Sequence, residues 1–121
     1  MARRVLVVDD HDDVRASIAA MLEADGCEVV ATAADGDEAV ALARRHLPEL
    51  VLLDIRLPGP NGFAVARELA LLSPPPTVVL MSSREARAYG DALAMSPALT
   101  FVTKGELSGA VLRRLLGEDV S

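Results

Sequence analysis

The sequence predicts a doubly wound α/β domain, in which helices cover both faces of a five-stranded parallel sheet. Short apolar runs alternate five times with longer stretches whose apolar residues recur at helical spacing. The runs are apolar on both faces, which suits parallel strands covered on both sides better than antiparallel strands. The length of 121 residues fits one compact domain and is too short for two ordinary ones. We therefore expect a single domain over 1–121.

Five segments are predicted to form the strands of this sheet. Each is a short run of mainly apolar residues, and the last run has the weakest pattern. In chain order, the predicted strands are 5–8, 28–31, 50–53, 77–81 and 99–102.

Five helices are predicted between and after these strands. Apolar residues from Val14 to Leu22 recur every three or four positions, which places them on one face of a helix. Glycine or proline ends most of the helical patterns. The prolines at 74–76 could also mark a linker, but neither flank alone carries enough strands to close a core. The helices are expected to run from Asp12 to near Gly26, from Asp35 to before Pro48, from Gly62 to Leu72, from Glu85 to Met95 and from Ser108 to Leu116.

The composition argues against several classes of protein. The net charge is −6, and an acidic chain without a basic stripe is a poor candidate for direct nucleic-acid binding. The longest apolar runs are far too short to span a membrane, and no signal peptide is visible. Cys27 is the only cysteine, so no internal disulfide is expected. We therefore expect a cytoplasmic protein that binds neither nucleic acid nor membrane by itself.

Acidic, hydroxyl and amino groups follow the predicted strands at one edge of the sheet. In an open parallel sheet, ligands bind beyond the carboxyl ends of the strands. Asp54 ends an apolar run, and burying an unpaired carboxylate costs several kcal/mol, roughly. We therefore expect Asp54 at the exit of its strand rather than in the core. The residues expected to meet at this edge are Asp9, Asp10, Asp54, Ser82, Ser83 and Lys104.

The three carboxylates predict a metal site. At a separation of ~5 Å and an effective dielectric of ~20, each like-charge pair repels by about 3 kcal/mol, and Lys104 alone cannot offset this. A divalent cation would do so, and oxygen ligands favour Mg²⁺, or Mn²⁺, over zinc. A metal beside a carboxylate, with a hydroxyl and a lysine opposite, suits a phosphoryl group that an Asp54 oxygen attacks in line.

Four segments carry a family resemblance: VLVVDD (5–10), LLDIRLPGPNG (52–62), VVLMSS (78–83) and FVTKGELSG (101–109). In this order and at these spacings, they resemble the receiver domain of bacterial two-component response regulators, from residue 3 to about residue 116. The resemblance implies a flavodoxin-like sheet with strand order 2-1-3-4-5. The KGELS ending (104–108) is most similar to receivers that precede a helix-turn-helix effector.

The resemblance also implies roles for the clustered residues. Asp54 would accept a phosphoryl group from the phosphohistidine of a sensor histidine kinase or phosphotransfer protein. Ser82 and Phe101 would take the switch positions, and Lys104 would contact phosphoryl oxygens, while small Ser83 keeps the entrance open. The Mg²⁺ ligands would be the side chains of Asp10 and Asp54, the backbone carbonyl of Arg56, and Asp9 largely through water.

The implied output is a switched surface rather than turnover of a small molecule. Apart from phosphotransfer to itself and autodephosphorylation, the domain would have no enzymatic activity. Phosphorylation would shift a surface formed by the fourth helix, fifth strand and fifth helix. That surface would contact a downstream effector domain or protein, or a second copy of the chain in a homodimer.

The sequence departs from the family pattern at three places. Gly105 stands where proline usually follows the lysine, so a cis bond at Lys104–Gly105 is not expected. The segment 95–99, Met-Ser-Pro-Ala-Leu, replaces the usual Gly-Ala before the last strand. Arg56 and Arg84 stand two residues after Asp54 and Ser82, where the family tunes hydrolysis, so we expect an altered phosphoryl lifetime of unstated direction.

Plainer interpretations stand beside these roles. The acids at 9–10 could cap the first helix, and Asp54 could begin a turn. Ser82 and Ser83 could be helix caps, and Lys104 an ordinary solvated lysine. Phe101 could be a core residue, which does not conflict with a switch role.

Two other functions remain as alternatives to the signalling switch. A phosphohydrolase that forms an aspartyl phosphate commonly has a second acid two residues after its nucleophile. Arg56 stands at that position, which argues against such an enzyme. An interaction module that has lost phosphorylation would not need Asp9, Asp10, Asp54 and Lys104, all of which are present.

Overall fold

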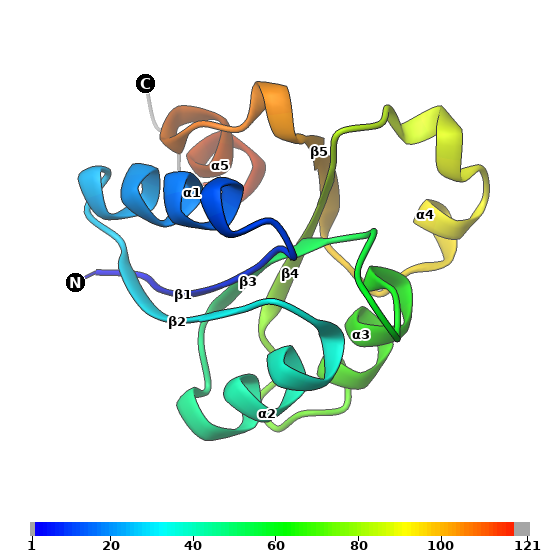
Figure 1. Cartoon of the computed structure of the whole chain (residues 1–121), viewed down its shortest axis with the longest axis horizontal. Helices are drawn as coiled ribbons and strands as arrows, with labels where there is room; N and C mark the ends of the chain where they lie inside the picture. The colour runs from blue at the N-terminus through cyan, green and yellow to red at the C-terminus, as the bar shows by residue number, and fades with distance from the viewer. Residues whose placement is uncertain (1, 118–121) are drawn as a thin grey trace.

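The computed structural model describes residues 2–117 and contains a five-stranded sheet between layers of helices (Figure 1). The strands lie in the order β2-β1-β3-β4-β5, and every neighbouring pair is parallel. The predicted fold class and strand order are therefore confirmed. In chain order the elements are β1 (Arg4–Val8), α1 (Asp12–Ala24), β2 (Glu28–Ala33), α2 (Gly36–His46), β3 (Leu50–Asp54), α3 (Gly62–Leu69), β4 (Thr77–Ser82), the 3-10 helix η1 (Ala86–Tyr89), α4 (Ala92–Met95), β5 (Thr100–Thr103), the 3-10 helix η2 (Lys104–Glu106) and α5 (Gly109–Leu115).

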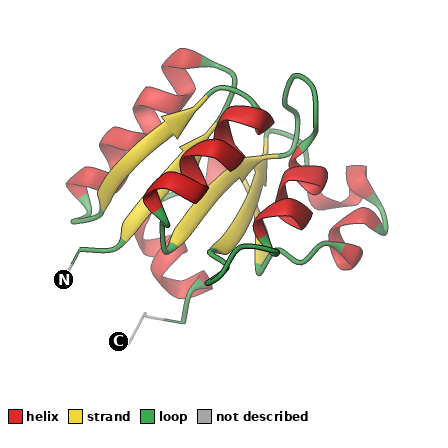
Figure 2. Cartoon of the chain, turned by 90° about the horizontal axis from the view of Figure 1, so that it is seen from below, coloured by secondary structure: helices red, strands yellow, loops and turns green. Residues whose placement is uncertain are grey.

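Each face of the sheet has its own apolar core. Helices α1 and α5 cover one face, and α2 and α3 cover the other (Figure 1, Figure 2). Successive residues of β4 alternate between the two cores, because side chains of a strand point to opposite faces in turn. Val78 packs with the α2 and α3 side, and Val79 with the α1 and α5 side. The central strands β1, β3 and β4 are thus buried on both faces, as predicted, whereas the edge strands β2 and β5 are only partly buried.

Side-chain caps define where three helices begin. The side chains of Asp35, Asn61 and Ser108 each accept a hydrogen bond from a backbone N–H three residues later. These bonds satisfy donors that the first turn of a helix leaves unpaired. The strand and helix ends are close to the predicted ones, and the clearest differences are that α3 stops at Leu69 instead of Leu72 and β2 continues to Ala33.

The predicted fourth helix, Glu85 to Met95, is wrong as a single element. The chain forms the four-residue η1, then Gly90 at a φ of 56°, then the four-residue α4. A positive φ cannot continue a right-handed helix, and glycine adopts it without the penalty of a Cβ. Pro97 follows soon after and prevents an extension.

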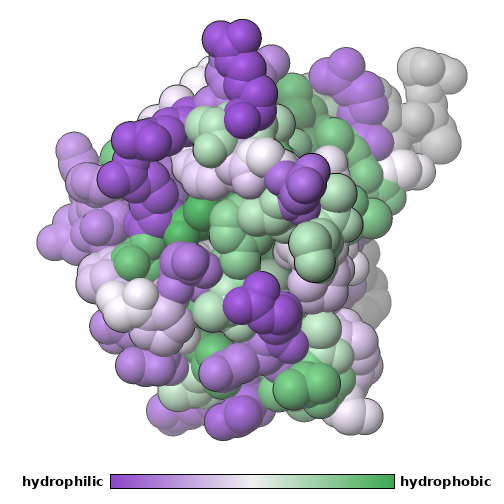
Figure 3. All heavy atoms as spheres, turned by 90° about the vertical axis from the view of Figure 1, so that its right-hand side faces the viewer, coloured by the Kyte–Doolittle hydropathy of each residue, from purple (hydrophilic) through white to green (hydrophobic). Residues whose placement is uncertain are grey.

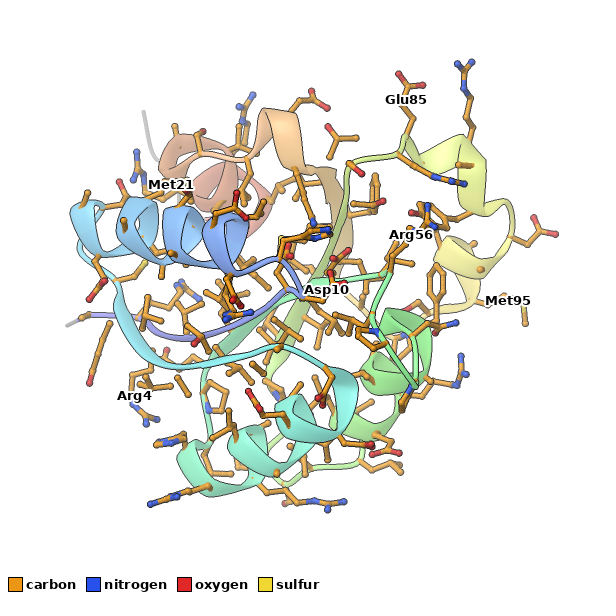
Figure 4. All side chains as sticks on the ribbon, in the orientation of Figure 1. Arg4, Asp10, Met21, Arg56, Glu85 and Met95 are labelled. Atoms are coloured by element: carbon orange, nitrogen blue, oxygen red, sulfur yellow. The ribbon has the colours of Figure 1, made fainter. Side chains whose placement is uncertain are left out.

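The side of the molecule that carries α4 mixes apolar and polar surface (Figure 3). Met95 is 82% exposed, and it projects outward beyond α4 (Figure 4). No helix within residues 2–117 is long and apolar enough to cross a membrane.

Candidate functional site

The carboxyl ends of β1, β3, β4 and β5 meet at one edge of the sheet, where a cavity lies between the loops. Asp10 and Arg56 lie on two of these loops (Figure 4). The structure brings most of the predicted site residues to this cavity. The predicted residues that line it are Asp10, Asp54, Arg56, Ser82, Ser83 and Lys104.

Asp54 is the last residue of β3, as predicted, but its burial exceeds the expectation. Only 2% of the residue is exposed, so it lies at the exit of the strand and is also enclosed by its neighbours. Its Oδ1 atom accepts a hydrogen bond of 3.1 Å from the backbone N–H of Arg56. Its Oδ2 atom accepts one of 3.1 Å from the Lys104 ammonium. These two donors offset part of the cost of burying this carboxylate.

Asp9 is fully buried, and its two oxygens have different surroundings. Oδ1 accepts a hydrogen bond of 2.8 Å from the backbone N–H of His11. Oδ2 lies 2.6 Å from Lys104 Nζ in an ion pair. Within residues 2–117, Oδ2 has no partner in hydrogen-bond geometry. Lys104 therefore bridges Asp9 and Asp54, and one cation is shared between two buried carboxylates.

Burial and charge oppose each other in these groups. Burial is the largest cause and raises the pKa of Asp54, and the nearby charge of Asp9 raises it further. The hydrogen bond and charge of Lys104 and the hydrogen bond from the Arg56 N–H lower it. The net effect is a raised pKa. Burial lowers the pKa of Lys104, but its bonds to Asp9 and Asp54 outweigh burial and raise it. The site therefore favours a charged lysine and leaves Asp54 harder to ionise than an exposed aspartate.

The carboxylates are close enough together to share a metal ion. One ligand atom from each of Asp9, Asp10, His11 and Asp54 lies within 4.8 Å of the others. Asp10 reaches this cluster from the end of β1, and His11 Nδ1 lies 3.0 Å from Asp10 Oδ1. The hard carboxylate oxygens of Asp9, Asp10 and Asp54 suit Mg²⁺. The His11 side chain is 65% exposed.

Gly62 holds the loop after β3 against Asp54. Its N–H donates a hydrogen bond of 2.8 Å to the Ile55 carbonyl. A Cβ at this position would lie 2.5 Å from the Asp54 carbonyl oxygen and 2.7 Å from Ile55 Cα. Both are backbone atoms, so only glycine allows this close approach. The bond between Lys104 and Gly105 is trans, as expected, since the one cis peptide within residues 2–117 is Ser73–Pro74.

Ser82 ends β4 at the site but its hydroxyl is engaged elsewhere. The residue is buried, and its Oγ accepts a hydrogen bond of 3.0 Å from the Arg84 N–H. The same oxygen shares a short hydrogen bond with the hydroxyl of Tyr89. Phe101 does not line the cavity; its ring centroid lies 6.1 Å from that of Tyr89. The sequence analysis missed Tyr89, although the scarcity of aromatic residues was a signal that could have found it.

Comparison with known proteins places the chain in one family. The response regulator receiver domain matches residues 5–115. The response regulator GacA of Pseudomonas viridiflava is 40% identical over 103 residues, which are 84% of this chain and 48% of that protein. The transcriptional regulatory protein PdtaR of Mycobacterium tuberculosis is 44% identical over 78 residues, 64% of this chain and 38% of that protein. The chain thus spans less than half the length of these two relatives.

A solved structure agrees with the sequence relatives. A two-component response regulator of the LuxR family from Aurantimonas sp. SI85-9A1 is 29% identical and superposes with a TM-score of 0.84. The match covers 100% of this chain and 90% of that one. A chemotaxis response regulator of Vibrio cholerae, CheY4, has the same fold at 24% identity, with a TM-score of 0.82 over 97% of this chain and 98% of that one.

Proposed function

The chain belongs to the response regulator receiver domain family of two-component signalling, and from this premise we propose that Asp54 accepts a phosphoryl group in a Mg²⁺-dependent reaction. The observation that carries the proposal is the placement of Asp54. It is the one acid of the cluster that ends a central strand, is buried, and receives both a backbone N–H and a lysine ammonium. The backbone N–H orients the carboxylate. The lysine ammonium can move its contact from the carboxylate to the oxygens of an added phosphoryl group.

The transfer is a displacement at phosphorus. An Asp54 carboxylate oxygen attacks the phosphorus atom and forms a P–O bond, while the bond from phosphorus to the donor breaks. With a phosphohistidine donor the P–N bond breaks, and the imidazole nitrogen keeps the electron pair and takes up a proton. The product is an acyl phosphate on Asp54. Hydrolysis of that acyl phosphate by water returns the free carboxylate and inorganic phosphate, which is the autodephosphorylation expected of the domain.

The residues around Asp54 divide the work of holding the incoming group. Lys104 Nζ already contacts Asp54 Oδ2, so its charge lies where negative charge develops on the phosphoryl oxygens. Ser82 lines the same cavity and carries a hydroxyl that can act as a neutral donor. Arg56 and Arg84 also line the cavity and add positive charge there.

Three acidic side chains fit the metal that this reaction needs. Asp10 and Asp54 would ligate Mg²⁺, with Mn²⁺ as a substitute, together with the carbonyl of Arg56, and Asp9 would act largely through water. When bound, the ion neutralises charge on the phosphoryl oxygens and on the crowded acids. The buried Oδ2 of Asp9, which has only the Lys104 ion pair, supports a requirement for further positive charge at this point.

The partners follow from the family and from the extent of the match. We propose that a sensor histidine kinase or phosphotransfer protein supplies the phosphoryl group, and that an effector domain or protein reads the result. The surface formed by α4, β5 and α5 would carry the output, and a homodimer through this surface is one form it can take.

The direct test is phosphorylation by a small donor. Incubation with Mg²⁺ and phosphoramidate should add one phosphoryl group to the intact mass, and chelation of Mg²⁺ or the substitution Asp54→Asn should abolish the addition. Asp10→Asn should slow it, because one proposed metal ligand is lost. A wild-type mass that stays unchanged would refute phosphoacceptor function, and an equal addition to Asp54→Asn would refute the assignment of the site.

A further inference from the structure

All three aromatic residues of the chain meet beside the cavity. The sequence contains two phenylalanines, one tyrosine and no tryptophan. The ring of Tyr89 lies between the other two, with centroid distances of 5.8 Å to Phe63 and 6.1 Å to Phe101. Phe63 is on α3, Tyr89 on η1 and Phe101 on β5. A chain that builds its cores from aliphatic residues thus places its whole aromatic content at one point.

Tyr89 is also the one partly buried residue of the segment 83–90, which leads from β4 toward α4 (Figure 1). The other residues of this segment are exposed, and only Tyr89 is partly buried. Its ring packs on the two phenylalanines, and its hydroxyl reaches past them to Ser82. The position of the segment against the domain therefore depends on this side chain.

The hydrogen bond to Tyr89 competes with the proposed use of Ser82. Within residues 2–117, the Ser82 hydroxyl bonds to Tyr89 and to the Arg84 N–H, and it has no hydrogen bond to Asp54. The Ser82 hydroxyl has a single proton. While Ser82 donates that proton to the Tyr89 oxygen, it cannot donate it to a phosphoryl group on Asp54. The two acceptors therefore compete for one proton.

We propose that Tyr89 is a positioning residue for phosphotransfer: its hydroxyl holds the Ser82 hydroxyl before phosphorylation, and a phosphoryl group on Asp54 takes Ser82 from it. The exchange replaces one hydrogen bond by another and needs no further covalent step. Loss of the bond releases the attachment of 83–90, so the state of Asp54 reaches the segment that leads into α4. This inference rests on the proposed phosphoacceptor function. It assigns the hydrogen bond with Ser82 to Tyr89 of η1, because Phe101 has no hydroxyl and cannot form it.

The first test is a double-mutant cycle on the initial rate of phosphorylation by phosphoramidate, followed by intact mass. Tyr89→Phe keeps the ring and removes only the hydroxyl. It should raise the rate by about threefold to tenfold, the factor that corresponds to one neutral hydrogen bond. In a Ser82→Ala background the same substitution should have no effect, since the two residues act through each other. Thr100→Val, which removes a hydroxyl from the far end of β5, is the matched control and should leave the rate unchanged.

The second test needs no substitution in Tyr89. Because Tyr89 is the only tyrosine and tryptophan is absent, the near-ultraviolet absorption and fluorescence of the protein report this side chain almost alone. Phosphorylation of Asp54, or Mg²⁺ with beryllofluoride as a phosphoryl mimic, should shift the tyrosine spectrum of the wild type. The shift should be absent in Ser82→Ala, in which the bond is already missing.

The outcomes separate this inference from the proposed function. If phosphoramidate adds no phosphoryl group to the wild type, the phosphoacceptor function and the Tyr89 role both fail. If the group is added but Tyr89→Phe reacts at the wild-type rate, or equally accelerates both serine and alanine backgrounds, only the Tyr89 role is overturned. A tyrosine spectrum that does not respond to phosphorylation overturns it independently.

Discussion

The ammonium group of Lys104 lies between two buried carboxylates, 2.6 Å from Asp9 Oδ2 and 3.1 Å from Asp54 Oδ2. One positive charge faces two negative charges there, and Asp10 adds a third acid nearby. Taking an acid out of this group should therefore have the opposite effect on stability from taking out the lysine. That contrast is the clearest property of the site at the scale of single residues.

Asp54→Asn should stabilise the protein in the absence of divalent metal. Burial raises the pKa of Asp54, so its ionised form disfavours the folded state. The disadvantage is absent below the ordinary pKa of aspartate and develops as the pH rises through the raised value. At neutral pH we expect a gain of about 1 kcal/mol, the usual size of a single-residue effect.

Urea unfolding in the presence of a chelator measures this gain. Repeating the titration with Mg²⁺ should stabilise the wild type much more than the variant, since the variant lacks one ligand. If the wild type were more stable than Asp54→Asn both with and without Mg²⁺, the ionised Asp54 would not destabilise the folded state. The gain should disappear in acid, where Asp54 is protonated.

Lys104→Met should destabilise the metal-free protein by about 2 kcal/mol, because removal of one partner from a buried ion pair leaves the other charges uncompensated. Methionine keeps most of the aliphatic stem, so the loss is mainly one of charge. Unfolding curves at neutral pH measure the effect, and Arg113→Met serves as a control on an ion pair that is more exposed. An unchanged midpoint for Lys104→Met would mean that the bridge contributes nothing to folding.

Two of the loops that form the site, those after β3 and β4, differ in how tightly they are held. The loop after β3 lies against backbone atoms of Asp54 and Ile55 through Gly62. The segment after β4 is mostly exposed and is anchored through Tyr89. A closely packed loop thus follows the acceptor at the end of β3, and a lightly held segment follows Ser82 at the end of β4.

Gly62→Ala tests the closely packed loop. The added Cβ would lie within 3 Å of two backbone atoms, so the loop must move, at a cost of about 1–3 kcal/mol. Thermal unfolding should show the loss, and phosphorylation by phosphoramidate should slow because the Arg56 N–H shifts away from Asp54. Gly105→Ala is the matched control, since a Cβ there meets nothing within 4 Å. Equal effects of the two substitutions would show that the close approach of Gly62 to Asp54 and Ile55 is not what makes glycine necessary there.

At the scale of the whole molecule, the sequence predicted the sheet better than the connections. The central strands β1, β3 and β4 were predictable because they are buried on both faces and carry continuous apolar runs. Asp54 was predictable as an acid at the end of such a run. The segment 85–95 was not predicted correctly, because the spacing of its apolar residues does not reveal that Gly90 adopts a positive φ. The contact of Tyr89 with Ser82 depends on that irregular path, so no periodicity indicated it. The cluster of site residues at the edge of the sheet, by contrast, could be predicted from the direction of the strands alone.

The two cores share every strand, so the domain should unfold as one unit. Val78 and Val79 are neighbours on β4 and lie in different cores, with at most 5% of either residue exposed. Val78→Ala and Val79→Ala should each lower the free energy of unfolding by about 2 kcal/mol, through lost burial and the cavity that remains. Because the sheet joins the cores, each variant should show a single transition with an unchanged denaturant slope.

Two probes distinguish one unit from two. Far-ultraviolet circular dichroism follows all helices, whereas tyrosine fluorescence follows Tyr89, which packs on the α2 and α3 side of the sheet. The two curves should coincide in the wild type and in both variants. If Val79→Ala lowered the transition seen by circular dichroism and left the tyrosine transition in place, the α1 and α5 layer would be unfolding by itself. A signal passed from Asp54 to the segment before α4 would then not require the opposite layer to remain folded.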